Sequence, residues 1–458
     1  MSSTNQGPAM DRIAQLLDAH SFVEIGAAVH ARSTDFSMQE QKTPSDGVVC
    51  GYGTVDDRLV FVYSQDASVM GGSIGEMHAK KIAALYDKAI AMGAPIIGML
   101  DSTGVRLEEA SDALEGLGAM MAASAKASGT ILQIAMVYGP CGGGLATFAS
   151  MADVVMMEKN ASFFFNSPNA IEGNFKEKND TSSAEYRATS DGVVDIAGDS
   201  AELCAKARKL LEMLPANCEE GEVINDSSDD LNRGVSVAGK KASEIIEEIA
   251  DAGSVVMLKP GYAECVSTAL ISLDGITVGV YGNNGNEICA GGCEKAADFI
   301  TFCDAFCIPV LSLTNVSGFK AAEGNEKRLG RAIAKLNIAT AEASVPKVNF
   351  IVGEALGSAY LSMNSKALGA DLVYALEGAK VAPMDAKLAA PIIAGEGADL
   401  AKVASDFENN QASLQAAAGR GYIDRIVSDA DARKYIISAF EMLLSKGETP
   451  ILKKHASR

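Results

Sequence analysis

The sequence predicts an α/β protein made of two related domains in tandem, and three observations support this. An apolar, strand-like segment at residues 130–137 runs into a glycine-rich turn at 139–144, and small apolar residues suited to a helix follow. The same strand–turn–helix pattern returns at residues 351–360. With 458 residues, 48% of them hydrophobic, the chain exceeds one ordinary core. Strands that alternate with helices indicate mainly parallel pairing within each domain.

The two copies keep a constant spacing over several landmarks. An offset of 214 residues separates Pro95 from Pro309, Asp101 from Asn315, Gly104 from Gly318 and Gly143 from Gly357. After the glycine turns, residues 152–155 correspond to residues 370–373, with an offset of 218. Because this period is far longer than a solenoid repeat of about 20–50 residues, it indicates duplication of a whole domain. We expect the two domains to span residues 1–220 and 221–458.

The first half is expected to begin with a short helix at 10–20, an exposed polar loop at 33–45 and a hairpin at 47–64 that turns at Asp56 and Asp57. A glycine-rich loop at 70–76 then leads into a helix that runs through residue 86, and a strand at 95–100 and a helix at 111–127 follow. Polar residues 158–200 are expected to form excursions near a site entrance. An acidic linker at 218–230 and a helix at 242–252 follow. The scheme then repeats from 273 to 385, before a final helix at 429–445.

Composition and charge exclude several classes of protein. The net charge of −20 argues against a surface for nucleic acid or anionic membrane, which needs clustered Lys and Arg. The N-terminal residues lack the basic start and apolar core of a signal peptide, and no apolar run approaches the length of a membrane span. We therefore expect a soluble, cytoplasmic protein. The loop at 70–76 has neither the dinucleotide-binding spacing nor a Walker lysine, so a nucleotide phosphate site is unsupported.

The duplicated glycine turns point to chemistry performed by the backbone. Glycine lets a ligand approach the main chain closely, and the first turn of a helix has N–H groups without an intrahelical partner. Two such N–H groups directed at one oxygen form an oxyanion hole, which stabilises charge that develops on a carbonyl. The alternative is a helix packed tightly against a strand, and the repetition of the pattern favours the oxyanion hole.

Side chains offer weaker candidates. His78 is the one histidine in a glycine-rich context, but neither turn has the GxSxG elbow of a serine hydrolase, and Ser358 follows its glycine instead of lying between two. Cys141 could act as a nucleophile, although packing in the core or turn is the favoured interpretation. Glu108 and Glu109 are more typical of a solvated helix face than of an acid–base pair.

Nine cysteines, an odd number, do not suggest a secreted disulfide framework. Cys289 with Cys293, and Cys303 with Cys307, have a spacing that zinc sites allow. Structural zinc ligands usually lie in loops, whereas residues 299–309 predict an amphipathic helix that leads into a strand. Core packing of these thiols is therefore the favoured interpretation, and we expect no metal in the chain.

Several stretches, in fixed order over residues 45–440, resemble the carboxyltransferase subunit of biotin-dependent acyl-CoA carboxylases and decarboxylases. This family has two crotonase-like (ClpP/crotonase) domains in tandem. The matching stretches are residues 69–82, 93–97, 139–144, 260–263, 295–300, 302–306 and 368–371.

The resemblance implies a reaction with two sites. In the N-terminal domain, the N–H groups of Gly143 and Gly144 would hold the thioester oxygen of an acyl-CoA as its enolate forms. In the C-terminal domain, N–H groups of Gly357, Ser358 and Ala359 would hold the ureido oxygen of biotin. Carboxybiotin would release CO2, the biotin anion would take the α-proton, and the enolate would attack CO2. The substrate-binding residues implied are Gly71, Gly72, Ser73, Gly104, Arg106, Gly142, Gly318, Phe319, Tyr360 and Leu361.

The resemblance also implies partners. Biotin would arrive on a separate biotin carboxyl carrier protein, because the chain has no attachment sequence and Lys259 lies in a segment that matches an internal strand of the family. A biotin carboxylase or a membrane decarboxylase subunit is a further partner. The N-terminal half of one subunit would face the C-terminal half of another, in a homo-oligomer built from dimers, with a hexamer favoured.

This chain departs from the family at several positions. Thr103 stands where the family has glycine, Ser358 replaces the second glycine of the biotin-side turn, and Leu361 replaces a frequent aspartate. Residues 165–190 are shorter than usual, and Ser317 stands where proline is usual. A substrate of the propionyl-CoA or methylmalonyl-CoA type is favoured. The alternatives are the carboxyltransferase step of a sodium-pumping decarboxylase, a non-catalytic paralogue that binds CoA or a partner, and, less favoured, a CoA hydratase or isomerase.

Overall fold

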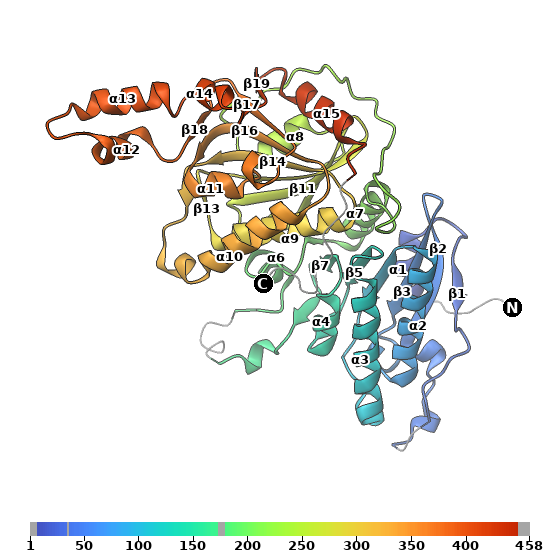
Figure 1. Ribbon diagram of the computed structural model, residues 1–458. Helices are drawn as coiled ribbons and strands as arrows, with labels where there is room; N and C mark the ends of the chain where they lie inside the picture. The colour runs from blue at the N-terminus through green and yellow to red at the C-terminus, as the bar shows by residue number, and fades with distance from the viewer. Residues whose placement is uncertain (1–6, 34–35, 173–178, 448–458) are drawn as a thin grey trace. The chain divides into compact units, whose positions relative to one another are not determined.

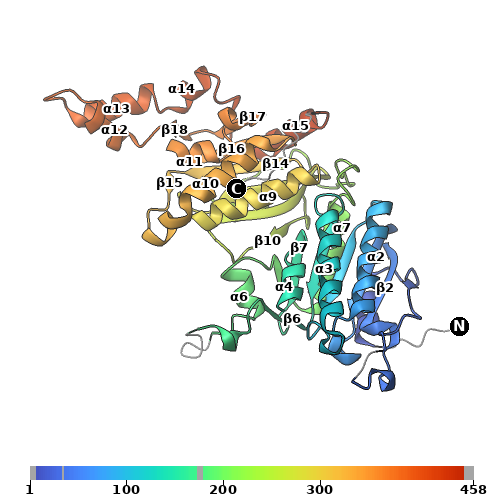
Figure 2. The same cartoon turned by 60° about the horizontal axis from the view of Figure 1, so that its bottom comes forward.

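The computed structural model describes residues 7–33, 36–172 and 179–447, and the chain divides into two compact units, Met1–Gly221 and Glu222–Arg458. Each unit has one twisted, mostly parallel sheet with helices packed against it (Figure 1). In each, a pair of long helices lies side by side over the sheet (Figure 2). These pairs are α2 (Glu76–Met92) with α3 (Ala110–Ala127), and α9 (Ala290–Ala305) with α10 (Glu323–Glu342).

The sheet of the first unit has the strand order β1-β2-β3-β4-β5-β7-β9. The strands are β1 (Val23–Ile25), β2 (Val48–Val55), β3 (Arg58–Gln65), β4 (Ile96–Leu100), β5 (Gln133–Val137), β7 (Val154–Glu158) and β9 (Ile196–Gly198). The first three pair antiparallel and the rest pair parallel. A separate parallel pair, β6 (Pro140–Gly142) and β8 (Ser162–Phe164), lies beside the glycine turn that follows β5.

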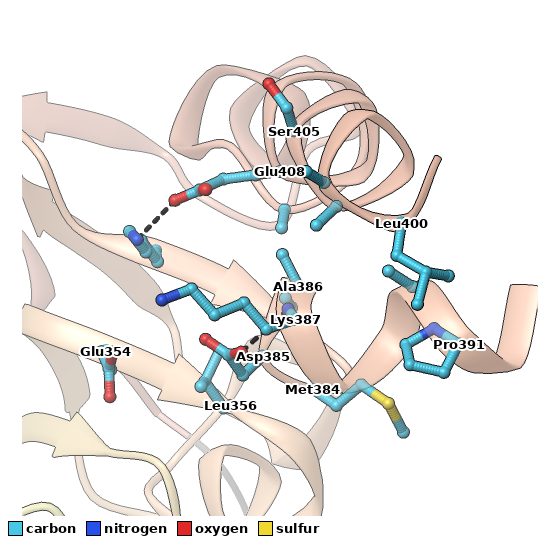
Figure 3. A pocket seen from close by; sticks show the side chains of 16 residues that line it. Glu354, Leu356, Met384, Asp385, Ala386, Lys387, Pro391, Leu400, Ser405 and Glu408 are labelled. Atoms are coloured by element: carbon cyan, nitrogen blue, oxygen red, sulfur yellow. Dashed lines mark hydrogen bonds and ion pairs between the residues drawn. The ribbon is translucent and has the colours of Figure 1, made fainter. Parts of the chain in front are cut away.

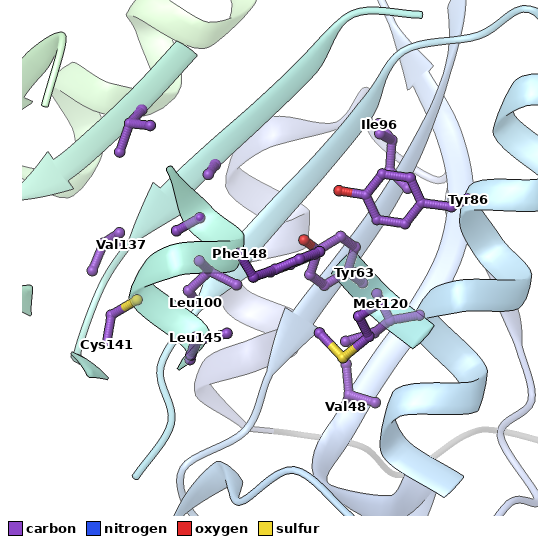
Figure 4. Packing of buried hydrophobic residues seen from close by; sticks show 14 of the residues in the cluster. Val48, Tyr63, Tyr86, Ile96, Leu100, Met120, Val137, Cys141, Leu145 and Phe148 are labelled. Carbon is purple, nitrogen blue, oxygen red and sulfur yellow. The ribbon is translucent and has the colours of Figure 1, made fainter. Parts of the chain in front are cut away.

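The remaining helices of the first unit are α1 (Pro8–Leu16), α4 (Gly144–Ala149), α6 (Ala184–Thr189) and α7 (Ser200–Met213), with 3₁₀ turns at Met38–Glu40, Pro44–Gly47, Met70–Gly72, Leu107–Glu109 and Pro168–Ala170. The core between the sheet and helices α2, α3 and α4 is aromatic at its centre (Figure 4). Tyr86 contacts both Tyr63 and Phe148, with ring centroids 6.2 and 6.1 Å apart. Cys141 is fully buried in the same cluster, so its predicted packing role is confirmed.

The second unit repeats this plan, with the strand order β10-β11-β12-β14-β16-β17-β19. The strands are β10 (Val256–Leu258), β11 (Val266–Leu273), β12 (Ile276–Asn283), β14 (Val310–Val316), β16 (Lys347–Leu356), β17 (Leu372–Leu376) and β19 (Arg425–Val427), and β18 (Lys380–Ala382) pairs with the end of β16. β13 (Glu287–Ile288) and β15 (Gly318–Phe319) form a second small ladder. The other helices are α8 (Ala242–Ile249), α11 (Gly357–Ser362), α12 (Ala386–Ile393), α13 (Leu400–Asn410), α14 (Leu414–Gly419) and α15 (Ala432–Leu443), with a 3₁₀ turn at Lys366–Leu368.

The duplication extends to individual backbone contacts. Asp153 accepts a hydrogen bond from the N–H of Gln133 at 2.8 Å, which orders the start of β5. Asp371 makes the equivalent bond to the N–H of Lys347 at 2.7 Å, at the start of β16. The predicted duplicated α/β fold is therefore confirmed.

The structure also differs from the sequence expectations in places. The polar loop expected to be exposed at residues 33–45 contains two 3₁₀ turns, and the side chains of Met38, Thr43 and Ser45 are buried; residues 34 and 35 lie outside the described part. Helix α7, which the sequence analysis did not single out, begins with a capping box made by Asp199 and Glu202. Helices α12 to α14 form an insertion between β18 and β19, and α12 and α13 extend away from the sheet (Figure 1).

Candidate active site

The first glycine turn lies where several short segments of the first unit meet. These segments are residues 70–74, 101–106, 139–144 and 162–164. The N–H of Thr103 donates to the carbonyl of Gly71 at 3.0 Å, and the N–H of Ser102 donates to the carbonyl of Pro140 at 2.9 Å. The structure thus brings together every glycine of this unit that the sequence analysis assigned to the acyl-CoA side.

Gly143 and Gly144 have different surroundings. Gly143 has φ +60° and ψ −123°, a conformation that strongly favours glycine, and its N–H donates to the carbonyl of Phe164 at 2.8 Å. Gly144 is the first residue of α4, so its N–H has no acceptor within that helix. The expectation that both N–H groups face a thioester therefore needs correction, because β8 already uses the N–H of Gly143. Residue spacing gave no sign that Phe164 would be its acceptor.

The other glycines separate into packing positions and open positions. A Cβ on Gly72 would meet the carbonyl oxygen of Asp101 at 2.3 Å, and a Cβ on Gly142 would meet the ring of Phe164 at 2.5 Å. In contrast, Cβ atoms on Gly104 and Gly143 would have no described atom within 4 Å. The first two glycines therefore permit close packing, whereas the last two border open space that a ligand could occupy.

Arg106 was expected to bind substrate, and the structure contradicts this. Its side chain is fully buried, and its Nη1 lies 2.7 Å from the carboxylate oxygens of both Asp46 and Glu109. Its Nε donates to the hydroxyl of Ser73 at 3.1 Å, and its Nη2 donates to the carbonyl of Ser73 at 2.8 Å. Arg106 therefore anchors the glycine-rich loop from beneath, and Glu109 belongs to this buried network instead of a solvated helix face. Ser73 is likewise buried and engaged by this arginine.

His78 belongs to the same buried region and is not placed as a general base. Its Nδ1 lies 2.9 Å from the carbonyl of Asp46, and its Nε2 lies 3.1 Å from the side-chain amide nitrogen of Gln65. Burial lowers the pKa of His78 to about 3, so the ring is neutral near pH 7. Burial also raises the pKa of the Cys141 thiol, which opposes formation of a nucleophilic thiolate. Neither side chain is therefore placed to act as a general base or a nucleophile at this turn.

The second glycine turn reproduces the first. Gly357 has φ +60°, as Gly143 has, and it begins α11 directly after β16. Gly357, Ser358 and Ala359 are the first three residues of this helix, so their N–H groups have no acceptor within it. The side chain of Ala359 is buried and that of Ser358 is exposed. Helix α11 packs against β15, where a Cβ on Gly318 would meet no described atom within 4 Å.

A cavity of about 450 Å³ adjoins this second turn. Its walls are mainly apolar or small, and its lining residues are Gly357, Ser358, Tyr360, Leu361, Val381, Ala382, Pro383, Gln411, Ala417, Arg420 and Tyr422. Burial raises the pKa of Tyr360 to about 12, so its hydroxyl stays protonated. Tyr360 and Leu361 lie at the cavity, whereas Phe319 lies on the β13–β15 ladder and is not among the lining residues.

A larger cavity, about 570 Å³, lies between the β16–β18 pair and helices α12 and α13 (Figure 3). It shares Ala382 with the glycine-turn cavity but includes no residue of the turn itself. Charged side chains line it, and two of them, Lys380 and Glu408, already form an ion pair. Because the larger cavity lacks the duplicated backbone feature, we place the candidate site at the smaller one.

The thiols considered as zinc ligands are divided between different surroundings. Cys293 and Cys303 are buried, whereas Cys289 lies against Cys265, a residue that the spacing argument had not included. Across residues 7–33, 36–172 and 179–447, no three His, Cys, Asp or Glu side chains are grouped so that they could hold a metal ion. In the same ranges, no helix combines the length and apolar character needed to cross a membrane.

The fold and the two glycine turns define a class of protein: a duplicated α/β protein in which each unit has a glycine turn between a parallel strand and a short helix. The model of the carboxyl transferase domain matches residues 3–457, and the chain belongs to this family. The family, the fold class and the carboxyltransferase activity expected from the sequence are thereby confirmed.

Known relatives align along nearly the whole chain. It is 37% identical to the propionyl-CoA carboxylase beta chain of Roseobacter denitrificans, covering 98% of this chain and 92% of the relative. It is 36% identical to the methylmalonyl-CoA carboxyltransferase 12S subunit of Propionibacterium freudenreichii subsp. shermanii, covering 99% of this chain and 92% of the relative. It is also 36% identical to the methylmalonyl-CoA decarboxylase subunit alpha of Veillonella parvula, covering 98% of this chain and 92% of the relative.

Solved structures agree with this assignment. A transcarboxylase 12S crystal structure, described as a hexamer with hydrolysed methylmalonyl-coenzyme A bound, superposes with a TM-score of 0.93 at 34% identity, covering 98% of this chain and 92% of that one. A single-chain, multi-domain long-chain acyl-CoA carboxylase has a TM-score of 0.80 at 24% identity, covering 94% of this chain and 45% of that one. The second likeness shows the fold alone.

Proposed function

We propose that this chain transfers a carboxyl group between biotin on a separate carrier protein and a CoA thioester of the propionyl-CoA and methylmalonyl-CoA type. The observation that carries the proposal is the pair of equivalent glycine turns. Gly143 and Gly357 share φ +60°, each at the end of a parallel strand and the start of a short helix. A reaction with one carbonyl oxygen on each partner requires two such sites.

On the acyl-CoA side, the first unit holds and polarises the thioester. The N–H of Gly144 donates to the thioester oxygen, while Gly143 provides the conformation that directs it. The open space beside Gly104 and Gly143 admits the acyl group without displacement of a side chain. Because an enolate carries more negative charge on this oxygen than the thioester does, the N–H donor stabilises the enolate more strongly.

On the biotin side, the cavity beside Gly357 fits a small bicyclic group with one polar edge. Ala382, Pro383 and Ala417 supply an apolar wall, and the N–H groups of Gly357 and Ser358, which line the cavity, supply donors for the ureido oxygen. Ala359, the next residue of the helix, supplies a further N–H. When bound, biotin supplies the carried carboxyl group and a basic site. The role of this chain is to hold that oxygen, position the ring system and exclude water.

The acyl group is inferred from the relatives, whose names specify propionyl-CoA and methylmalonyl-CoA. Leu361, which lines the cavity of the second turn and is 45% exposed, adds apolar surface where the resemblance predicts a frequent aspartate. The decarboxylase relative supports a second candidate, in which the same transfer is the first step of a decarboxylation. The direction depends on the partner subunits.

We also propose that the chain works in the cytoplasm as a homo-oligomer, with a hexamer favoured. Helix α12 exposes large apolar side chains, with Leu388, Ile392 and Ile393 exposed to 67%, 71% and 54%. An apolar helix face of this kind is typical of an interface between subunits. The related 12S structure is described as a hexamer assembly.

The test is the conversion of methylmalonyl-CoA to propionyl-CoA in the presence of free biotin, followed by mass spectrometry, with malonyl-CoA and glutaconyl-CoA as alternative substrates. Biotin-dependent loss of the carboxyl group from methylmalonyl-CoA is the expected result. No turnover with any substrate, while CoA thioesters still raise the melting temperature, would favour a binding paralogue. The absence of both turnover and binding would refute the proposed site.

A further inference from the structure

Two cysteines of the second unit lie in direct contact at the start of α9. The Sγ atoms of Cys265 and Cys289 are 2.9 Å apart. Cys265 immediately precedes β11, and Cys289 follows β13 and forms the N-cap of α9. Both residues are half-buried. A disulfide bond requires a sulfur–sulfur distance of about 2.05 Å, so only a small approach separates this pair from a covalent link.

The backbone and one glycine hold the two sulfurs together. The N–H of Cys289 donates to the Sγ of Cys265 at 3.4 Å, and the N–H of Gly292 donates to the Sγ of Cys289 at 3.3 Å. A Cβ on Gly292 would lie 2.6 Å from the Sγ of Cys265, so glycine is required where α9 passes this sulfur. The pair therefore occupies a specific packed arrangement.

The two thiols differ in acidity. The hydrogen bond from the Cys265 thiol lowers the pKa of Cys289 to about 6, and the N–H of Gly292 and the positive charge of Lys320 act in the same direction. The same hydrogen bond raises the pKa of Cys265, because it keeps the proton there. One sulfur is thus prepared as a nucleophile and its neighbour as the partner that resolves the reaction.

The other seven cysteines also lie within the described residues, and most of them are less accessible than this pair. Cys50, Cys141, Cys204, Cys293 and Cys303 are buried. Cys218 and Cys307 are half-buried. Cys265 and Cys289 are half-buried thiols whose sulfur atoms are in contact.

We propose that Cys265 and Cys289 form a reversible disulfide, so that this pair is an oxidation site of the chain. With a peroxide as oxidant, the Cys289 thiolate attacks one peroxide oxygen, the O–O bond breaks, and Cys289 becomes a sulfenic acid as hydroxide leaves. The Cys265 sulfur then attacks the Cys289 sulfur, the S–O bond breaks, and water leaves with the thiol proton. Two thiols and one peroxide give one disulfide and two waters, and a thiol reductant reverses the change by disulfide exchange.

The crosslink would lie next to the second glycine site. Ile288, directly before Cys289, pairs with Phe319 on β15, and its carbonyl accepts a hydrogen bond from the N–H of Lys320 at 2.9 Å. Oxidation would therefore join the start of β11 to the small ladder that carries Gly318. The proposal concerns the dithiol itself and does not depend on the identity of the acyl-CoA.

The test uses the reduced, full-length protein exposed to hydrogen peroxide or to oxidised glutathione and then alkylated under denaturing conditions. Trypsin would leave Cys265, Cys289 and Cys293 on one peptide, because no Lys or Arg lies between Cys265 and Cys293. Cleavage after glutamate places Cys265 on residues 265–287, and Cys289 with Cys293 on residues 288–294. The expected product is a linked pair of these peptides, lighter by two hydrogens than their sum and restored by dithiothreitol.

Matched variants assign the link to its residues. Cys289→Ser and Cys265→Ser should each abolish the linked product, and Cys218→Ser, which removes another half-buried thiol, should leave its yield unchanged. If a variant fails to fold, the linked peptides from the wild-type protein still identify the two cysteines that are joined. Full alkylation of Cys265 and Cys289 after oxidant treatment, or a link from Cys289 to Cys293 in place of Cys265, would overturn the proposal.

Discussion

Replacement of Gly143 by alanine tests the proposed acyl-CoA site most directly. The added methyl group would meet no described atom within 4 Å, so the substitution creates no clash inside the protein. Its cost to folding is the strain of φ +60° and ψ −123° for an L-residue, about 1–3 kcal/mol. For a unit of this size, each kcal/mol lowers the melting temperature by about 2–4 °C.

The effect on catalysis should be much larger than the effect on folding. Relaxation of the strained turn moves the adjacent N–H of Gly144, and the methyl group occupies space assigned to the acyl group. Loss of one oxyanion donor typically lowers turnover by about 10²–10³-fold. We expect kcat/KM for biotin-dependent decarboxylation of methylmalonyl-CoA to fall by about 10²-fold, measured by mass spectrometry at matched protein concentration.

Gly129 offers a matched control. It has φ +66°, and a Cβ there would also have no described atom within 4 Å. Gly129 lies before the start of β5, however, whereas Gly143 lies after the end of that strand. Gly129→Ala should therefore lose similar stability and keep the wild-type rate. Equal rates in the two variants would refute the assignment of Gly143 to the site. Gly143→Pro is a poorer test, because proline would also remove the N–H that bonds to Phe164.

Three further predictions concern the second turn, the buried ion network and the thiol pair. Gly357→Ala should lose biotin-dependent turnover yet still bind CoA thioesters. It should be less stable than Gly143→Ala, because its methyl group would lie 3.3 Å from the carbonyl oxygen of Pro383. Arg106→Met should lower the free energy of unfolding in urea by about 3–5 kcal/mol, because Asp46 would keep a buried carboxylate without its cation. Alkylation of Cys289 by iodoacetamide should be half-maximal near pH 6 and slow below it, where the thiolate is protonated. This midpoint should rise in Cys265→Ala, which loses the hydrogen bond that contributes most to the lowered pKa of Cys289.

The first two of these predictions each have a control in the same chain. Gly253→Ala, at φ +71° with open surroundings, should retain activity. Arg32→Met, which removes half-exposed ion pairs to Glu76 and Asp112, should cost less than about 1 kcal/mol. A similar loss of stability for Arg32→Met and Arg106→Met would contradict the buried-network argument, and an unchanged midpoint in Cys265→Ala would contradict the thiol argument.

The sequence alone was sufficient for the features that repeat or that follow local rules. The offset between Gly143 and Gly357 predicted two equivalent turns, and the structure gives both the same φ. Alternating apolar residues predicted the β2–β3 hairpin, and Asp56 and Asp57 turn it with positive φ values. Such features depend on backbone conformation and residue periodicity, which short stretches of sequence encode.

The tertiary structure decided which groups are engaged and which are available. Spacing placed Arg106, Ser73 and Glu109 near a glycine loop, but could not reveal that Asp46, more than fifty residues earlier in the chain, would bury the guanidinium with them. Nor could spacing reveal that the carbonyl of Phe164 would accept a hydrogen bond from the N–H of Gly143. Hydrogen-bond partners and burial depend on segments far apart in sequence, so the same arginine or N–H can face a substrate or the interior. Sequence determined the two turns, and packing determined which of their atoms remain free to react.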